Sequence, residues 1–220
     1  MPETKALLFW LGGVLTESLS DLTLSVLTPG ASGAERLAWK QTLDPFLVQL
    51  TLGEIDSSTF WREAGPACAS GISSGEAHVE ITALARPRRE VLEIIGKVPE
   101  RYQVWLVSDF PVDWVGKMAA GGRLAEHFPP DRIIFTASLG LNQLQPDIFQ
   151  ALPRAANLEM RECLVIDGVS SRAVAGIKLG LNSIIYVYPE RLAHELTLQK
   201  IIEGRVDVMH PSASERVELL

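Results

Sequence analysis

From about residue 87 onward, short apolar runs alternate with amphipathic stretches, and this alternation limits the fold more than any other feature. The apolar runs cover residues 104–107, 133–135, 164–166 and 183–187. Helical patterns lie between and after them, near 112–121, 146–157, 171–179 and 189–202. Strands that alternate with helices of this length form a parallel, doubly wound sheet. The sequence therefore predicts an α/β fold with a Rossmann-like core.

Residues that favour helix starts support this pattern. Pro146 and Pro189 stand where two of these helices are expected to begin, and proline suits the first helical turn because its missing N–H is not needed there. Ser170 or Ser171 is expected to cap the helix that follows Asp167.

The chain begins with a further apolar run, residues 5–11, which ends in Gly12-Gly13. This is the pattern of a buried central strand followed by a turn that lets backbone approach a ligand. In parallel sheets, ligands bind beyond the carboxyl ends of the strands. Trp10, Ser108 and Asp167 each stand at such an end, so we expect them to lie close together.

Residues 16–86 have a helical pattern without a clear strand. Helices are predicted over 43–52 and 57–69, and a third follows Ser73, which can form a capping box with Glu76. We therefore expect a core built from residues 1–15 and 87–220 and an inserted helical cap subdomain over 16–86. The stretch 71–75 matches a Gly-x-Ser-x-Gly nucleophile elbow, but no strand precedes it, so a loop and helix cap is the better interpretation.

Four segments, in chain order, resemble the motifs of the haloacid dehalogenase-like (HAD) hydrolases, in the subgroup with a helical cap. They are the stretch Phe-Trp-Leu-Gly-Gly-Val-Leu at 9–15, the strand ending in Ser108, the stretch 140–149 with Pro146, Ile148 and Phe149, and the strand ending in Asp167. The resemblance covers roughly residues 5–190. It implies an α/β core with an inserted cap and a mechanism in which an aspartate is the nucleophile and Mg²⁺ is held by carboxylates.

The residues that carry this chemistry are missing at several motif positions. Trp10 stands where the family has its nucleophilic aspartate, Gln143 where it has a lysine, and Gly168 where it has the second metal-binding aspartate; Gly12 replaces an acid–base aspartate that some members also lack. An indole has no charge and no lone pair for attack, and a neutral amide cannot balance a phosphate as a lysine does. We therefore expect no catalytic residues and no cofactor. Mg²⁺ is expected, at Asp167, only if some activity persists.

The altered site has two interpretations. Trp10 is either an aromatic platform for a ligand or, as we favour, a filler of the space that phosphate and metal would occupy. Asp167 is expected to pair with a nearby cation such as Arg172 or to accept backbone N–H groups, and Ser108 to cap the turn that follows it. If the edge still binds a ligand, the expected residues are Gly12, Gly13, Ser108, Asp109, Asp167 and Arg172, and the ligand is a small anion.

Composition excludes several classes of partner. The net charge of −7 over 220 residues, without a basic stripe, argues against nucleic acids and acidic membranes. The one basic cluster, residues 86–89, is interpreted as a solvated helix start. No apolar stretch reaches membrane-span length, and the first residues do not resemble a signal peptide. Cys68 and Cys163 form no disulfide or metal pattern, which favours the cytoplasm.

The leading functional hypothesis is a non-catalytic HAD-like protein that binds a small anion or a protein partner. The alternative is an active, phosphatase-like hydrolase with an atypical mechanism that uses Asp167 or a water held by Asp109. A third hypothesis makes Trp39 and Trp61 of the cap a contact surface. Trp10→Asp alone is expected to give no phosphatase, whereas adding Gln143→Lys and Gly168→Asp is expected to have a better chance.

Overall fold

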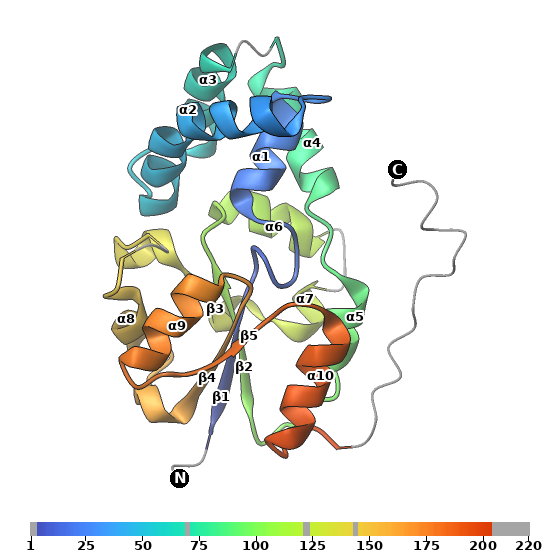
Figure 1. Ribbon diagram of the computed structural model, residues 1–220, viewed down its shortest axis with the longest axis vertical. Coiled ribbons are helices and arrows are strands. Elements are labelled where there is room, and N and C mark those ends of the chain that lie inside the picture. The colour runs from blue at the N-terminus through green and yellow to red at the C-terminus, as the bar shows by residue number, and fades with distance from the viewer. Residues whose placement is uncertain (1–3, 69–70, 121–123, 143–144, 204–220) are drawn as a thin grey trace, which may run out of the picture.

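The computed structural model describes residues 4–68, 71–120, 124–142 and 145–203 (Figure 1). It contains a five-stranded sheet in the order β3-β2-β1-β4-β5, and every pair of neighbouring strands is parallel. The strands are β1 (Ala6–Trp10), β2 (Gln103–Ser108), β3 (Ile133–Phe135), β4 (Cys163–Asp167) and β5 (Asn182–Ile185). The predicted α/β class with a parallel sheet is confirmed.

The central strand is β1, and all of its side chains are fully buried. Its register aligns Ala6 with Gln103 of β2 and with Cys163 of β4. A strand that is covered on both faces has no solvent side, so its sequence is a continuous apolar run rather than an alternating one. This burial explains why the first strand is recognisable from residues 5–11.

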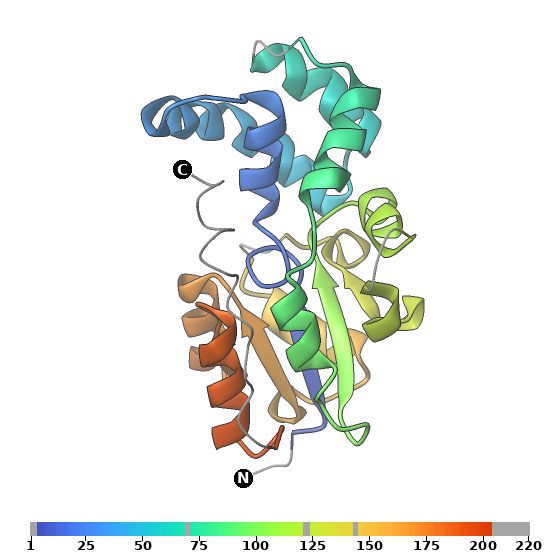
Figure 2. The same cartoon turned by 90° about the vertical axis from the view of Figure 1, so that its right-hand side faces the viewer.

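Helices cover both faces of the sheet (Figures 1 and 2). On one face lie α8 (Ile148–Ala155) and α9 (Ser170–Lys178), and on the other lie α5 (Arg89–Ile95), α7 (Leu124–His127) and α10 (Pro189–Leu198). Helix α6 (Val112–Ala120) follows β2. Three short 3-10 turns complete this part: η1 (Pro130–Arg132), η2 (Thr136–Leu139) and η3 (Met160–Glu162).

Four further helices lie together beyond the carboxyl ends of the strands (Figures 1 and 2). They are α1 (Leu19–Leu27), α2 (Gly33–Leu52), α3 (Ser57–Ala67) and α4 (Ser74–Leu84). Ser73 caps α4 and forms the predicted capping box with Glu76. The loop-and-cap interpretation of residues 71–75 is thereby confirmed. Across the four described ranges, no helix is both long enough and apolar enough to cross a bilayer.

Several predicted helix starts are wrong. Helix α2 begins at Gly33 rather than near residue 43, because Ser32 and Glu35 form a second capping box there. Neither Ser170 nor Ser171 caps α9: Val169 is the cap residue, and its own N–H donates to the Asp167 carboxylate at 2.8 Å. Pro189 is the first residue of α10 as predicted, but α8 begins two residues after Pro146.

The cap and the core are joined by aromatic rings. Trp61 of α3 stacks on Trp114 of α6 with centroids 5.2 Å apart and planes inclined by 16°. Phe60, His78 and Phe110 meet Trp114 edge-on at 6.3–6.4 Å. Aromatic pairs of this geometry add stability beyond the area that they bury. The four cap helices are thus fixed to the sheet domain through one continuous apolar core.

Candidate functional site

The carboxyl ends of β1, β2 and β4 bring together the residues that the sequence analysis placed there. Trp10 and Asp167 are fully buried, and Arg172 of α9 contacts both of them. Ser108 is also fully buried, and Asp109 is 5% exposed. The predicted convergence is therefore correct, but the residues form part of the interior rather than an open site.

The Trp10 ring is covered by a cation. The guanidinium carbon of Arg172 lies 3.8 Å from the ring centroid, a distance typical of a strong cation–π contact. No hydrogen-bond partner of the indole nitrogen is found among the described residues. A fully buried ring beneath a guanidinium offers no face to a ligand. The space-filling interpretation of Trp10 accounts for this geometry, and the platform interpretation does not.

Asp167 is held by Arg172 in a two-point contact. Arg172 Nε donates to one carboxylate oxygen, and Nη2 donates to the other at 2.7 Å. The N–H of Val169 also donates to Asp167. Both side chains are at least 95% buried, so little water screens the pair. The prediction that Asp167 pairs with Arg172 or accepts backbone N–H groups is confirmed in both parts.

Asp109 is the second buried carboxylate at this edge. Burial raises its pKa above the ordinary aspartate value, while the charge of Arg172 opposes this effect and that of Asp167 adds to it. One of its carboxylate oxygens has no hydrogen-bond partner within the described ranges. Desolvation therefore dominates the electrostatics of Asp109 and favours its protonated form.

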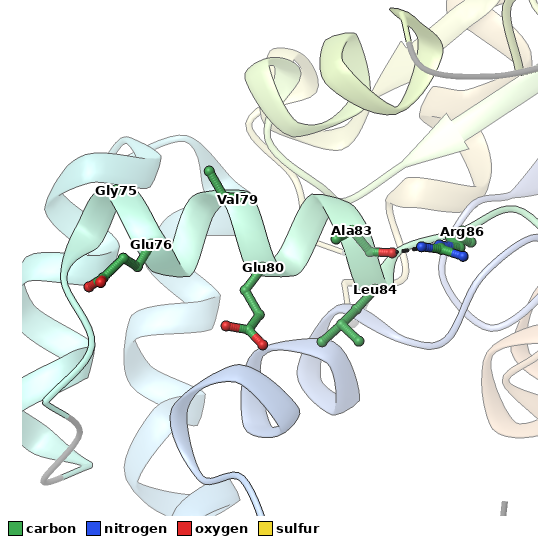
Figure 3. Close-up of a pocket in the computed structure, with 7 residues that line it drawn as sticks. All are labelled: Gly75, Glu76, Val79, Glu80, Ala83, Leu84 and Arg86. Carbon is green, nitrogen blue, oxygen red and sulfur yellow. Dashed lines mark hydrogen bonds between the residues drawn. The ribbon is translucent and has the colours of Figure 1, made fainter. Parts of the chain in front are cut away.

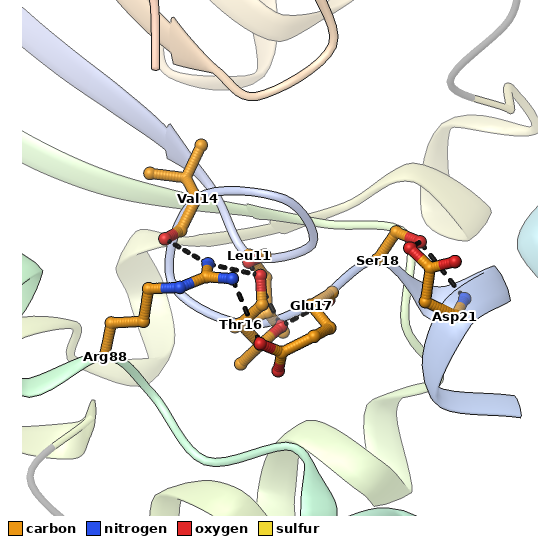
Figure 4. A network of polar contacts seen from close by, with 7 residues as sticks. All are labelled: Leu11, Val14, Thr16, Glu17, Ser18, Asp21 and Arg88. Atoms are coloured by element: carbon orange, nitrogen blue, oxygen red, sulfur yellow. Dashed lines mark hydrogen bonds and ion pairs between the residues drawn. The ribbon is translucent and has the colours of Figure 1, made fainter. Parts of the chain in front are cut away.

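The turn after β1 is closed by its own hydrogen bonds and by Arg88 (Figure 4). Gly13 N–H donates to the Thr16 carbonyl at 3.0 Å. The Thr16 hydroxyl donates to the Leu11 carbonyl. The Arg88 guanidinium reaches into the turn and donates to the carbonyls of Val14 and Thr16 at 2.7 and 2.6 Å. The interpretation of residues 86–89 as merely solvated is wrong for Arg88, because backbone carbonyls of the turn need its donors.

The same turn also fills the space beside Gly168, where the resemblance would place a second carboxylate. A Cβ atom at Gly168 would lie 2.3 Å from the carbonyl oxygen of Gly13, a distance that no real Cβ contact shows. Gly13 itself has a φ of +86°, a conformation that glycine adopts without strain. The turns after β1 and β4 are therefore in direct backbone contact. Any side chain at Gly168 requires one of them to move.

Two of the groups expected to donate to an anion, the Gly13 N–H and the Ser108 hydroxyl, already donate within the protein. Gly13 N–H binds Thr16, and the Ser108 hydroxyl donates to the Phe110 carbonyl and accepts from the Phe110 N–H at 3.0 Å. The predicted capping role of Ser108 is thus confirmed. Gly12 is buried beside Phe110 and the Asp109 carboxylate. Gln143 lies outside the described residues.

The residues at this edge do not fit a Mg²⁺ ion. Mg²⁺ prefers carboxylate oxygens in octahedral geometry, but both oxygens of Asp167 bind Arg172. Gly168 has no room for a second carboxylate. Nowhere in the described parts of the chain do three or more His, Cys, Asp or Glu side chains gather as metal ligands. The guanidinium supplies the positive charge that the carboxylate needs.

Two parts of this arrangement were missed by sequence reasoning. The role of Arg88 had no local signal, because its partners lie more than 70 positions earlier in the chain. The close approach of Gly13 to Gly168 had a weak signal: both are glycines at strand ends, where backbone approaches are common. Only the fold shows that the backbone lying against Gly168 is that of Gly13.

Breaking the buried pair is expected to destabilise the protein strongly. Arg172→Ala should lower the free energy of unfolding by about 3–5 kcal/mol, because it leaves a buried carboxylate without its partner. Arg89→Ala is the matched control: Arg89 pairs with Glu93 at 2.9 Å on the exposed surface and should lose at most about 1 kcal/mol. Urea denaturation of both variants measures the difference, and equal losses would contradict the role given to the pair.

The contact between the two turns predicts a second contrast. Gly168→Ala should lower the free energy of unfolding by about 1–3 kcal/mol, since the new Cβ has no space. Gly116→Ala in α6 meets nothing within 4 Å and should stabilise the helix by up to about 1 kcal/mol. Thermal melts of the two alanine variants test this. A Gly168→Ala variant as stable as the parent would show that the turns separate easily.

The raised pKa of Asp109 predicts a pH dependence. The folded state keeps this proton to a higher pH than the unfolded state, so stability falls as pH rises from the ordinary aspartate pKa toward the raised one. Asp109→Asn should therefore melt at a higher temperature than the parent near about pH 7, and the gap should narrow toward about pH 4. A gap that widens on acidification would mean that Asp109 is buried as a stabilised anion.

The comparisons with known proteins give likeness in structure but not in sequence. No protein-family model matches the chain, and no curated protein sequence matches it either. Solved structures match over most of the chain. A HAD family enzyme from Bacteroides thetaiotaomicron has a TM-score of 0.71 and 19% identity, covering 89% of this chain and 99% of its own.

Two other structures extend this result. A predicted HAD-like family hydrolase from Porphyromonas gingivalis has a TM-score of 0.70 and 18% identity, covering 92% of this chain and 100% of its own. The L-2-haloacid dehalogenase from Xanthobacter autotrophicus has a TM-score of 0.63 and 16% identity, covering 94% and 92%. The Bacteroides enzyme was also solved in complex with magnesium and inorganic phosphate. The chain has the α/β fold of the HAD-family enzymes.

Proposed function

We propose that this HAD-like protein does not carry out aspartyl-phosphate chemistry and acts by binding a partner. The observation that carries the proposal is Trp10, which stands at the nucleophile position and is fully buried beneath Arg172. Covalent catalysis of this type requires a carboxylate that a substrate can reach. An indole provides neither the charge nor the access.

The surroundings of Trp10 support the same proposal. Arg172 pairs with Asp167, the carboxylate that a metal would need. The backbone of Gly13 fills the space that an acidic side chain at position 168 would take. Both features leave the edge without the carboxylate oxygens that a Mg²⁺ ion would need. Several separate parts of the mechanism are thus absent together.

An atypical hydrolase is the alternative, and the geometry does not favour it. Asp167 has both oxygens bound to Arg172, so it is poorly suited to attack or to proton transfer. Asp109 has a raised pKa, a property common at catalytic sites. Its cause here is burial under the closed turn, and a general base must reach the proton that it removes. Asp109 is therefore better explained as an interior carboxylate.

The two cap tryptophans do not form a shared exposed surface. Trp61 is buried against Trp114, which removes it from the proposed tryptophan contact surface, and Trp39 is only partly buried. Binding of a small anion at the carboxyl edge remains a prediction, and titration with inorganic phosphate tests it. A protein or small-molecule partner needs no donor from that edge, and we favour it. The two cysteines are free and buried, which supports the proposed cytoplasmic location.

The proposal predicts no phosphatase activity. The purified protein should hydrolyse p-nitrophenyl phosphate and a panel of small phosphoesters no faster with Mg²⁺ than with EDTA. Trp10→Asp should remain inactive, because it adds a third carboxylate beside Asp109 and Asp167 without adding a cation. The variant that also carries Gln143→Lys and Gly168→Asp should be no more active than Trp10→Asp. A side chain at position 168 would collide with the backbone of Gly13.

The matched control is Asp167→Asn, purified identically to reveal contaminating phosphatases while preserving side-chain size. Turnover in the parent protein that disappears in Asp167→Asn would overturn the proposal and support the atypical hydrolase. Robust Mg²⁺-dependent activity in Trp10→Asp would show that the metal site forms despite Arg172 and Gly168.

A further inference from the structure

Helix α2 has an uncharged, mostly apolar side that faces away from the protein. One side of the helix packs on α1, α3 and η2, and the residues buried there are Leu43, Leu47, Leu50 and Thr51. On the opposite side, residues spaced three and four apart form a second row, because an α-helix turns once in about 3.6 residues. This row, the outer stripe, consists of Ala34, Leu37, Ala38, Gln41, Pro45 and Val48, and all six are exposed.

The outer stripe differs from the solvent side of an ordinary surface helix. It contains no charged residue, and its largest apolar members, Leu37 and Val48, are 62% and 36% exposed. It extends over about 21 Å, since a helix rises about 1.5 Å per residue. The first turns of α2, drawn in blue, reach beyond the other cap helices (Figure 2). A helix with apolar residues on two opposite sides is typical of one that is covered on both.

Two charges border the middle of the outer stripe. Lys40 and Asp44 are exposed, and neither forms an ion pair with another described residue. A lysine four positions before an acidic residue is the less favourable order for pairing within one helix. In an antiparallel pair of α2 helices with a two-fold axis at Thr42, each Lys40 lies level with Asp44 of the second copy. The charges are thus complementary to themselves.

Gln41 fits the same arrangement. It is the polar member at the centre of the outer stripe, and across this axis the two Gln41 residues are about 3 Å apart along the helix direction. A side-chain amide both donates and accepts, so the two amides can bond to each other. Leu37 of one copy lies level with the gap between Pro45 and Val48 of the second copy, so the apolar side chains can interdigitate.

We propose that this protein forms an antiparallel homodimer in which the outer stripes of two α2 helices pack against each other. A two-fold dimer requires one patch that is complementary to itself, and the charges, the amide and the apolar spacing all meet this requirement. We expect one helix pair to bury less than the about 1,600 Å² of a standard interface, which favours a weak dimer with a Kd of about 1 to 100 µM. Dimerisation goes beyond the proposed function, because the stripe does not involve the closed carboxyl edge.

The groove along α4 is another exposed apolar surface (Figure 3). It is lined by Val79 and Leu84, which are 65% and 43% exposed, and by Glu76 and Glu80. A second copy seated there would bring further glutamates against these two, and like charges across an interface repel. The groove is therefore not complementary to itself, and Val79 serves as a control position.

Sedimentation velocity of the full chain at increasing concentration tests the proposal. The weight-average sedimentation coefficient should rise from the monomer value toward the dimer value across about 1 to 100 µM. Leu37→Lys places a charge inside the stripe and should weaken dimerisation at least roughly tenfold. Leu37 is exposed in the monomer, so this variant should still fold. Val79→Lys, a matched change on α4, should leave dimerisation unchanged.

Exchanging the two charges tests the orientation of the helices. Lys40→Asp or Asp44→Lys alone brings like charges level with each other, and each should weaken the dimer roughly threefold to tenfold. The double variant Lys40→Asp with Asp44→Lys restores opposite charges at both positions. Its dimerisation should return to that of the parent protein.

Three results would overturn the proposal. A monomer at every concentration would leave the stripe to another segment of the chain or to a different protein. Dimerisation that Leu37→Lys does not weaken more than Val79→Lys would place the interface elsewhere. A double charge variant that dimerises no better than the two single variants would exclude the antiparallel pairing of α2.

Discussion

The ion pair of Asp167 with Arg172 is the interaction on which the carboxyl edge of the sheet depends. Asp167 ends a central parallel strand and is fully buried, and a buried ionised carboxylate is costly unless a positive charge and hydrogen bonds compensate it. Here the chain provides that charge itself, in a two-point contact that also places the guanidinium over Trp10. The charge of the carboxylate is thereby balanced within the chain.

The parts that close this edge support one another. With Arg172 in place, a large apolar ring at Trp10 gains a cation–π partner, and the turn after β1 can fold down until Gly13 meets Gly168. Arg88, from the start of α5, then holds this turn through its backbone carbonyls. If one of these residues is replaced, the others no longer fit around it. The effects of substitutions at these positions on the free energy of unfolding are therefore not expected to be additive. The closed geometry is therefore a property of the whole edge rather than of one residue.

The aromatic contact between α3 and α6 holds the cap helices against the sheet domain. Trp61 stacks on Trp114, and Phe60, His78 and Phe110 meet Trp114 edge-on. The boundary between the two parts is therefore itself a piece of the apolar core, and the cavity lined by Ser57, His78 and Asp113 lies beside it.

The sequence by itself determined the parallel α/β class, the run of helices before residue 87 and a tryptophan rather than a carboxylate at residue 10, because periodicity, caps and residue chemistry are local properties. It also indicated Arg172, which lies five positions later in the first turn of the following helix, as a partner of Asp167. The predicted start of α2 was wrong because the capping box at Ser32 and Glu35 begins the helix ten residues before its hydrophobic pattern becomes clear. The tertiary structure alone decided that Gly13 closes the space at Gly168, that Arg88 enters the turn, and that Trp61, His78 and Asp113 share one cavity. These depend on segments far apart in the chain approaching one another, and only packing determines such approaches.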